Sequence, residues 1–432
     1  MRRALHLQPD RRPRQPRPHM GRLTRTIALL LLGGLTACTA AFSAPRTPIT
    51  IGALYPLSGP LAHYGTEELR GVKIATDAFN ARGGVHGRRI ALDVVDAPDV
   101  DRGWRESYLL ARRGTPVIVG TYSSTISLAA SEAAHRNGVV YWETGAVADL
   151  VTSRGYDEVF RMGPSGATLA RQAAAFSTEV LAPRFKIATS ALKIAVIYEN
   201  DPYGSSVGAG IRHEAALRGF RLAGSFPYDP ATETFAGIIR SLARSRPDVV
   251  VAASYLADGA RFRTALVAAK LPIKAMIGKC AAFYTPAMAA LLGKKIDGVF
   301  VADKPMDIAP SALSPRGLAL EREFVSRYRR RFGGAPETAA YMGFSGAWAL
   351  FEGALGRARS LAPKDIEAAA RSIDMPWGSL PNGAGVSFEG RSSAMEGQND
   401  RAFGVVWQWQ DGKPVLVWPP AAARGKPLLS SR

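Results

Sequence analysis

Three loops with small and hydroxyl-bearing residues are the part of this sequence best suited to holding a ligand. They are Tyr55-Pro-Leu-Ser58-Gly-Pro60, Gly120-Thr-Tyr122-Ser123-Ser124-Thr125 and Glu143-Thr144-Gly145-Ala146. Small side chains let backbone N–H groups approach a ligand, and the N–H groups at the start of a helix favour an anionic group. Each loop taken singly is also explained as a turn with a helix N-cap. Taken together at successive strand ends, the loops predict one binding crevice.

Signatures of enzymes are absent from the sequence. The segment Gly343-Phe-Ser-Gly-Ala lacks the last glycine of a nucleophile elbow, and no phosphate-binding G-x-x-x-x-G-K-[ST] occurs. Two cysteines and six scattered histidines exclude a cysteine-rich zinc or iron–sulfur site. The sequence therefore predicts a binding protein that uses no cofactor or metal.

The loops lie within a regular alternation of strand-like and helix-like segments. The apolar runs Ile49–Leu54 and Val117–Gly120 read as buried strands, and residues 61–79 have helical spacing. The same rhythm restarts after Pro164 and continues to Ala302. This pattern predicts α/β architecture with two parallel sheets, each covered by helices. Near the C-terminus, antiparallel strands are expected at 386–388, 405–409 and 415–418, with a hairpin turn at Asp411-Gly412.

The composition is that of a globular chain with a basic balance. Among 432 residues, 47% are apolar and 21% charged, which excludes a mostly disordered protein. The net charge of +19 includes eight arginines and one aspartate within residues 1–37. The remaining arginines are spread along the chain and no nucleic-acid-binding module is present. We therefore expect no nucleic-acid partner.

The N-terminal segment has the features of an export signal. A basic start from Met20 precedes the apolar run Ile27–Leu35, which is too short to span a bilayer and suits a signal-peptide core. It ends in Leu35-Thr-Ala-Cys38, which looks like a bacterial lipobox with a lipidated cysteine. Cleavage after Ala44 without lipidation is the alternative. We expect a signal peptide over 1–37, with Met20 as an alternative start, and a protein of the periplasm or cell envelope that is lipid-anchored to a membrane.

The chain resembles type I periplasmic substrate-binding proteins of the leucine/isoleucine/valine-binding branch, which serve ABC importers. The resemblance is carried by Ile49-Thr-Ile-Gly-Ala-Leu-Tyr-Pro-Leu-Ser-Gly-Pro-Leu-Ala, by Phe79-Asn80 and by Gly83-Gly84-Val-His-Gly87. It extends through Asn200-Asp201-Pro202-Tyr203-Gly204 and Ala340-Tyr341. The resemblance implies two Rossmann-like lobes, joined by three chain crossings, that close on a small molecule.

This family implies lobes built from discontinuous segments. We expect a linker at 38–47, a first lobe from 48–164 plus 303–375, a second lobe from 165–302 plus 376–425, and a tail at 426–432.

The resemblance also assigns site residues. The family's carboxylate-binding hydroxyl and backbone groups fall on Ser123, Ser124, Thr144 and Ala146, and the aromatic residue that the second lobe presses onto the ligand falls on Tyr203. Packing under a turn is the alternative role of Tyr203. The candidate set is completed by Tyr55, Ser58, Tyr122, Glu143, Tyr255 and Lys279.

One loop departs from the pattern of amino-acid binders. Where they usually place an acidic residue for the ligand ammonium, this chain has Gly278-Lys279-Cys280. A lysine there would repel an ammonium group, unless it is a solvated loop residue. Glu143 could supply the missing anion or form an internal pair with Lys279. A carboxylate, an aromatic acid or a polar amide is therefore as compatible with the site as leucine.

The expected partners are a small polar or acidic solute and the permease and ATPase subunits of an ABC importer. The alternative is a ligand sensor with the same fold that signals to a regulatory protein.

Overall fold

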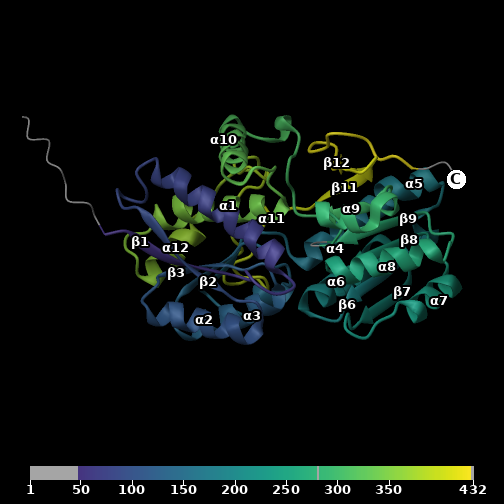
Figure 1. The fold of residues 1–432 in the computed structure, drawn as a ribbon, viewed down its shortest axis with the longest axis horizontal. Helices are drawn as coiled ribbons and strands as arrows, with labels where there is room; N and C mark the ends of the chain where they lie inside the picture. Colours follow the sequence, from purple (N-terminus) through teal and green to yellow (C-terminus); the bar gives the residue numbers. More distant parts are fainter. Residues whose placement is uncertain (1–46, 280–281, 430–432) are drawn as a thin grey trace, which may run out of the picture. The chain divides into compact units, whose positions relative to one another are not determined.

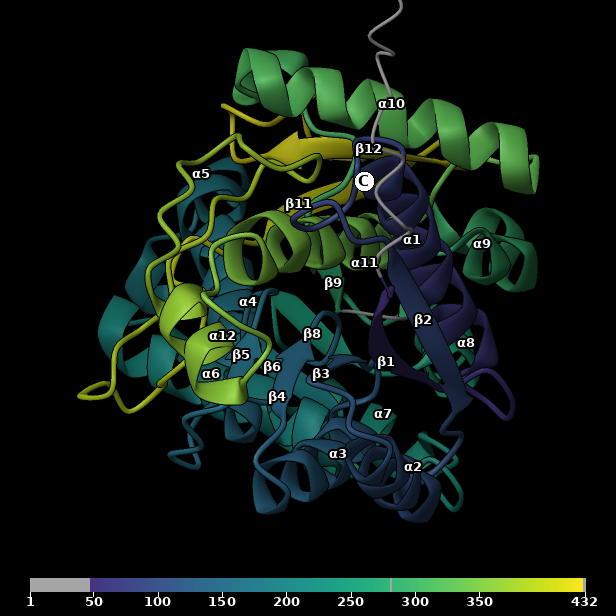
Figure 2. The same cartoon turned by 90° about the vertical axis from the view of Figure 1, so that its left-hand side faces the viewer.

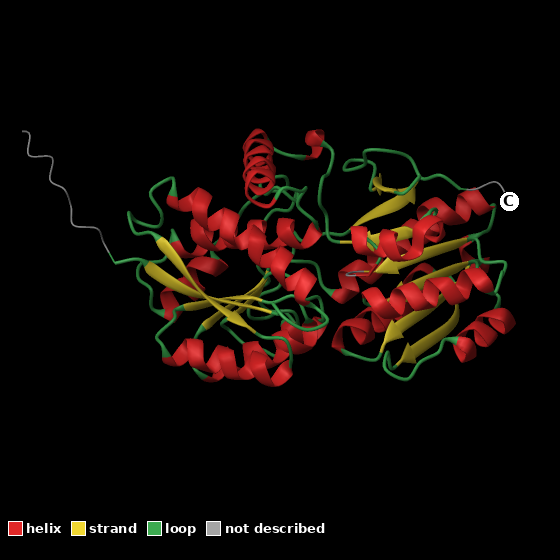
Figure 3. Ribbon diagram, viewed as in Figure 1, coloured by secondary structure: helices red, strands yellow, loops and turns green. Residues whose placement is uncertain are grey.

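The computed structural model describes residues 47–279 and 282–429, which contain two separate β-sheets (Figure 1). Helices flank both sheets (Figure 3). Strands of parallel sheets are buried on both faces, which explains why they read as continuous apolar runs in the sequence. The predicted signal peptide and Cys38 lie outside the described residues.

The first lobe holds a five-stranded parallel sheet in the order β2-β1-β3-β4-β5. Along β1, Ile51 packs into one apolar cluster and Leu54 into another, because alternate side chains point to opposite faces. Helices α2 and α3 cover the Leu54 face, and α1 and α11 cover the opposite one (Figure 2). The strands are β1 (Ile49–Tyr55), β2 (Ile90–Asp96), β3 (Val117–Gly120), β4 (Val140–Glu143) and β5 (Val159–Arg161), and the helices are α1 (Ala62–Asn80), α2 (Val100–Arg112), α3 (Ser124–Arg136), α10 (Pro315–Phe332), α11 (Thr338–Ala349) and α12 (Pro363–Arg371).

The second lobe holds a seven-stranded sheet in the order β12-β11-β10-β9-β8-β6-β7. Strands β6 to β10 are parallel, whereas β11 and β12 are antiparallel and meet at the predicted hairpin turn Asp411-Gly412. Both turn residues have positive φ, which suits glycine and is tolerated by aspartate. The strands are β6 (Lys193–Glu199), β7 (Arg221–Tyr228), β8 (Val249–Ala253), β9 (Ala275–Lys279), β10 (Phe300–Asp303), β11 (Val405–Gln410) and β12 (Lys413–Trp418), and the helices are α4 (Gly166–Phe176), α5 (Ala182–Phe185), α6 (Pro202–Arg218), α7 (Ala236–Ser245), α8 (Leu256–Ala268) and α9 (Pro286–Leu292).

The chain crosses between the sheets after β5, after β10 and before β11. Two side chains just before the third crossing are hydrogen-bonded to the end of β5 and to the segment that follows it. Gln398 accepts a hydrogen bond from the guanidinium of Arg161 and donates one to the carbonyl of Gly163 at 2.9 Å. Asn399 donates to the carbonyl of Met162 at 3.1 Å. Burial lowers the pKa of Arg161 to about 10, so this side chain remains protonated at neutral pH.

The segment before β11 packs differently from the expected division into lobes. Residues 376–425 are expected in the second lobe, but Leu380, Val386 and Phe388 pack in the same apolar cluster as Trp142 of the first lobe. Val386 and Phe388 form single bridges, to Met375 and Asn399, rather than the expected strand. Within residues 376–425, only β11 and β12 pair with the second sheet. The third crossing therefore lies between residue 399 and β11.

Helices α1 and α11 approach each other through glycines. A Cβ atom added to Gly71 would lie 2.1 Å from the carbonyl oxygen of Ala340, and one added to Gly343 would lie 2.0 Å from the carbonyl oxygen of Glu68. Neither backbone atom can move without moving its helix. The two helices carry the residues Glu68 and Gly346, which lie next to the site described below.

Candidate functional site

The three loops of the sequence analysis lie at one edge of the first sheet. Leu54 pairs with Gly120 and Gly120 with Glu143, so the carboxyl ends of β1, β3 and β4 are adjacent. Because parallel strands end at the same edge, the loops that follow them are neighbours. The tertiary structure thus brings these loops together as the sequence predicts.

A small cavity lies between these loops and the second lobe, and we call it the interlobe cavity. Its volume is about 10 Å³, which is room for about one water molecule. Seven residues line it: Tyr122, Ser124, Gly145, Val147, Tyr203, Tyr255 and Lys304. Four of them are predicted site residues, and the sequence analysis missed Gly145, Val147 and Lys304 as lining residues.

Two tyrosines form the second-lobe wall of the interlobe cavity. Tyr203 lies in the first turn of α6 and Tyr255 directly precedes α8. Their rings meet edge to face, with centroids 5.4 Å apart. Asp201 caps α6 by accepting a hydrogen bond from the Gly204 N–H at 2.7 Å, and burial raises its pKa to about 6.

The first-lobe wall is formed by Tyr122 and Ser124. The Tyr122 ring stacks on that of Tyr64 at 4.8 Å, and its hydroxyl lies 3.3 Å from that of Tyr284 in the second lobe. Ser124 Oγ accepts hydrogen bonds from the Val147 and Ala148 N–H groups at 3.3 and 3.1 Å. Its own hydroxyl hydrogen is then the group with which Ser124 can donate to a ligand.

Glu143 is fully buried and accepts hydrogen bonds from the backbone of the neighbouring loops. The Gly145 and Ala146 N–H groups donate to its Oε1, both at 2.7 Å, and the Thr121 N–H lies 3.0 Å from Oε2. The Ser127 and Tyr141 hydroxyls also donate to it. The backbone N–H of Ala146, predicted for a ligand carboxylate, is thus occupied by a carboxylate of the chain itself.

Four other predicted residues make contacts outside the cavity lining. Ser123 Oγ caps α3 through the Ile126 N–H at 3.4 Å. The buried hydroxyls of Tyr55 and Thr144 lie 3.1 Å apart. Ser58 donates to Asp96, which also holds the loop backbone. In this structure the Ser123 side chain is therefore a helix N-cap, which is the alternative role given in the sequence analysis.

Lys279 is fully buried, and its amine donates a hydrogen bond to the carbonyl of Leu169 in α4. It is not one of the residues that line the interlobe cavity. The interpretation of Lys279 as a solvated loop residue is wrong, because its side chain is directed into the second lobe.

Glu68 is a buried carboxyl group next to the cavity that the sequence analysis missed. It lies on α1, and its carboxylate oxygens occupy the space that a Cβ atom on Gly145 would need, 2.3 and 2.7 Å from that position. Burial and the nearby carboxylate of Glu143 raise its pKa well above the usual range, although the charge of Lys304 and the Thr144 hydroxyl act the other way. Its surroundings therefore disfavour the charged form of Glu68. Its only signal in the sequence is an acidic residue on the apolar face of an amphipathic helix.

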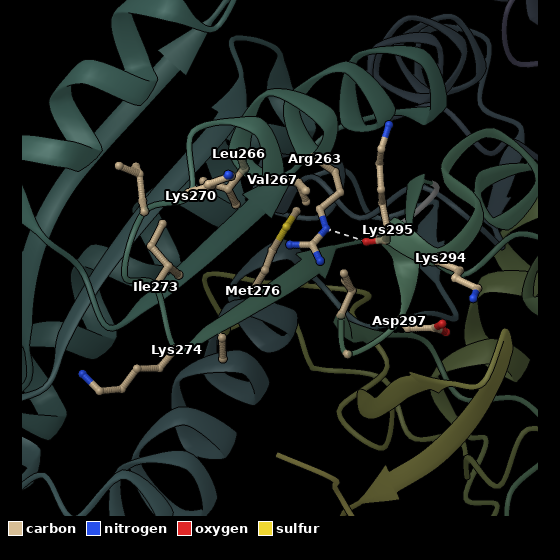
Figure 4. A pocket seen from close by; sticks show the side chains of 14 residues that line it. Arg263, Leu266, Val267, Lys270, Ile273, Lys274, Met276, Lys294, Lys295 and Asp297 are labelled. Atoms are coloured by element: carbon tan, nitrogen blue, oxygen red, sulfur yellow. Dashed lines mark hydrogen bonds between the residues drawn. The ribbon is translucent and has the colours of Figure 1, made fainter. Parts of the chain in front are cut away.

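A larger cavity of about 550 Å³ lies elsewhere in the second lobe, between α8, β9 and the segment before β10 (Figure 4). Met276, Leu266 and Arg263 line it, and the Nε of Arg263 donates a hydrogen bond to the carbonyl of Lys295. This cavity is at the amino ends of β9 and β10. Ligands of parallel sheets bind at the opposite, carboxyl ends, which makes the interlobe cavity the candidate ligand site.

Within residues 47–279 and 282–429, no group of three or more histidine, cysteine, aspartate or glutamate side chains is arranged to hold a metal ion. In the same part of the chain, the helices are too short or too polar to cross a bilayer.

The family described as "Periplasmic binding protein" matches residues 48–412. The chain belongs to this family. Its members bind a solute rather than transform it, which confirms the prediction of a binding protein and not an enzyme. Family membership also implies a location outside the cytoplasm.

Among relatives, the "Leu/Ile/Val-binding protein homolog 8" of Brucella suis is 34% identical over 93% of this chain and 98% of its own length. The "homolog 7" of the same organism is 32% identical over 91% of this chain and 97% of its own length. The predicted leucine/isoleucine/valine-binding branch is therefore confirmed.

Solved structures show the same fold. The leucine-binding protein LivK from Thermotoga maritima has a TM-score of 0.73 at 17% identity and covers 86% of this chain and 98% of its own. A solute-binding protein from R. palustris in complex with benzoate has a TM-score of 0.67 at 19% identity and covers 88% of this chain and 98% of its own. These likenesses confirm the predicted fold of a type I periplasmic binding protein.

Proposed function

We propose that this protein captures a small polar or acidic solute in the interlobe cavity and delivers it to an ABC importer. The observation that carries the proposal is the convergence of polar and aromatic side chains from both lobes on one cavity at the carboxyl ends of the strands. It is supported by relatives named as Leu/Ile/Val-binding proteins, and by neighbouring structures determined with isoleucine and with benzoate.

A solute can enter only if the lobes move apart. The interlobe cavity has a volume of about 10 Å³. Ordinary ligand sites are far larger, with volumes of about 300–1,000 Å³. The three crossings between the sheets are the segments about which such a hinge motion would occur. Closing would remove the solute from water and present a different surface to an importer.

The proposal predicts that Ser124→Ala weakens solute binding by about 1–3 kcal/mol, because a ligand oxygen would lose a buried hydrogen-bond donor. Native mass spectrometry of protein purified without added ligand would identify the retained solute, and calorimetry would measure its affinity. Ser326→Ala, on the exposed side of α10, is the matched control and should bind as wild type. Wild-type affinity in Ser124→Ala would contradict this site.

We also propose that Cys38 carries a lipid anchor. Cys38→Ser should then release the protein from the membrane fraction into the soluble extracytoplasmic fraction, because the acyl chains supply the membrane affinity. Membrane fractionation with immunoblotting measures this. Equal membrane association of both proteins would contradict the anchor without affecting the proposal of solute binding.

A further inference from the structure

The usual anion-binding position of the first-lobe loops is already filled in this chain. The Gly145 and Ala146 N–H groups both donate to Glu143 Oε1 at 2.7 Å, and the Thr121 N–H donates to the same carboxylate. Each N–H is a single donor, so these groups cannot also hold a ligand carboxylate without displacing Glu143. An anionic group of the ligand must therefore be held elsewhere in the cavity.

Lys304 is the charged side chain among the seven described residues that line the interlobe cavity. It follows β10 at the second crossing, and only 3% of its surface is exposed. Its amine lies 5.1 Å from the centre of the Tyr122 ring, where the ring face attracts a cation. Among the described residues, its amine has no hydrogen bond or ion pair that would neutralise it.

A buried ammonium group needs a counter-charge. The Glu143 carboxylate already accepts hydrogen bonds from backbone and hydroxyl donors. Burial and Glu143 raise the pKa of Glu68, which disfavours the charged form that could pair with Lys304. An anion in the cavity would supply the missing charge, and the Ser124 hydroxyl could donate a second hydrogen bond to it.

The remaining walls of the cavity suit a flat, apolar body. Tyr122, Tyr203 and Tyr255 present rings to it, and Val147 adds an aliphatic surface. Aromatic faces pack well against rings, and none of these four side chains carries a negative charge at neutral pH that could hold an ammonium group.

We infer that the ligand is a small carboxylate with a ring-like apolar body and without an ammonium group, and that Lys304 binds its carboxylate. This inference rests on the proposed function, since it names the class of solute that the same cavity takes.

The test is calorimetric titration of the full-chain protein with benzoate, benzamide, L-phenylalanine and L-leucine. Benzamide has nearly the shape of benzoate but no charge, and the two amino acids add an ammonium group. We expect benzoate to bind about 10- to 100-fold more tightly than benzamide, as a charge-assisted hydrogen bond would give. Both amino acids should bind more weakly than benzoate.

Lys304→Met should remove the preference for benzoate over benzamide, and Lys304→Arg should retain it because the charge remains. Lys294→Met, an exposed lysine that does not line this cavity, is the matched control and should leave the preference unchanged. Thermal melting checks that each variant is folded. If Lys304→Met does not fold, the wild-type order of the four solutes and Lys304→Arg still decide the matter.

Tighter binding of leucine or phenylalanine than of benzoate, or equal binding of benzoate and benzamide, would overturn the inference but leave solute capture intact. Binding of none of the four probes would also overturn it. If native mass spectrometry in addition found no retained solute of any class, the proposed function itself would fail.

Discussion

Glu143→Ala should destabilise the protein by about 3–5 kcal/mol, measured as the free energy of unfolding in urea. The carboxylate is fully buried and accepts hydrogen bonds from the backbone of two loops, at Thr121 and at Gly145-Ala146. Removing it would leave these N–H groups buried without an acceptor, because the short alanine side chain cannot reach them.

Two further measurements separate the carboxylate's role from simple loss of volume. Glu143→Gln keeps one oxygen acceptor and nearly the same shape, so it should lose roughly half as much stability as alanine. Formate added at millimolar concentration should partly restore the stability of Glu143→Ala by occupying the vacated position. A fall of less than about 1 kcal/mol in the alanine variant, with no effect of formate, would show that the loops do not depend on Glu143.

Gly71→Ala should lower the free energy of unfolding by about 3 kcal/mol, although alanine normally favours a helix over glycine by about 1 kcal/mol. The added Cβ would lie 2.1 Å from the Ala340 carbonyl oxygen and 2.7 Å from the Phe344 nitrogen, so α1 and α11 would have to separate. A backbone clash cannot be relieved by a change of rotamer, and we therefore expect packing to outweigh propensity.

Gly334→Ala is the matched control for this prediction. A Cβ atom there meets nothing within 4 Å and its φ is not positive, so the variant should melt within about 1 °C of wild type. We also expect Gly71→Ala to weaken solute binding, because a shift of α1 would move Glu68, which lies next to Gly145 of the interlobe cavity. An unchanged or raised melting temperature in Gly71→Ala would show that the two helices have room to adjust.

The order of elements was predictable from local patterns. Buried parallel strands such as Val117–Gly120 are apolar throughout, and amphipathic helices such as α1 repeat apolar residues every three or four positions. The position of the third crossing was not predictable in this way. The strand-like pattern of Val386 and Phe388 does not indicate which lobe they pack against. Their packing partners lie more than 200 residues away in the chain, around Trp142 and Phe160.

The candidate site shows the same division. Motifs and strand ends in the sequence mark Tyr122, Ser124, Tyr203 and Tyr255, and all four line the interlobe cavity. Whether a side chain there faces the cavity depends on its rotamer and on its neighbours from other strands. Glu143 was expected to face a ligand or Lys279, but the register of β4 on β3 sets it beside the Thr121 N–H.

By itself, the sequence determined the fold, the family and the edge of the sheets at which we propose that a ligand binds, because these follow from periodicity and from motifs contiguous in the chain. Only the tertiary structure decided which charges remain for the ligand. In the folded chain, Glu143 accepts hydrogen bonds from backbone N–H groups and Lys279 donates to the Leu169 carbonyl, whereas Lys304 lines the cavity. The physical reason is that the charge a ligand meets depends on which groups neutralise one another, and those pairings are made by residues far apart in the sequence.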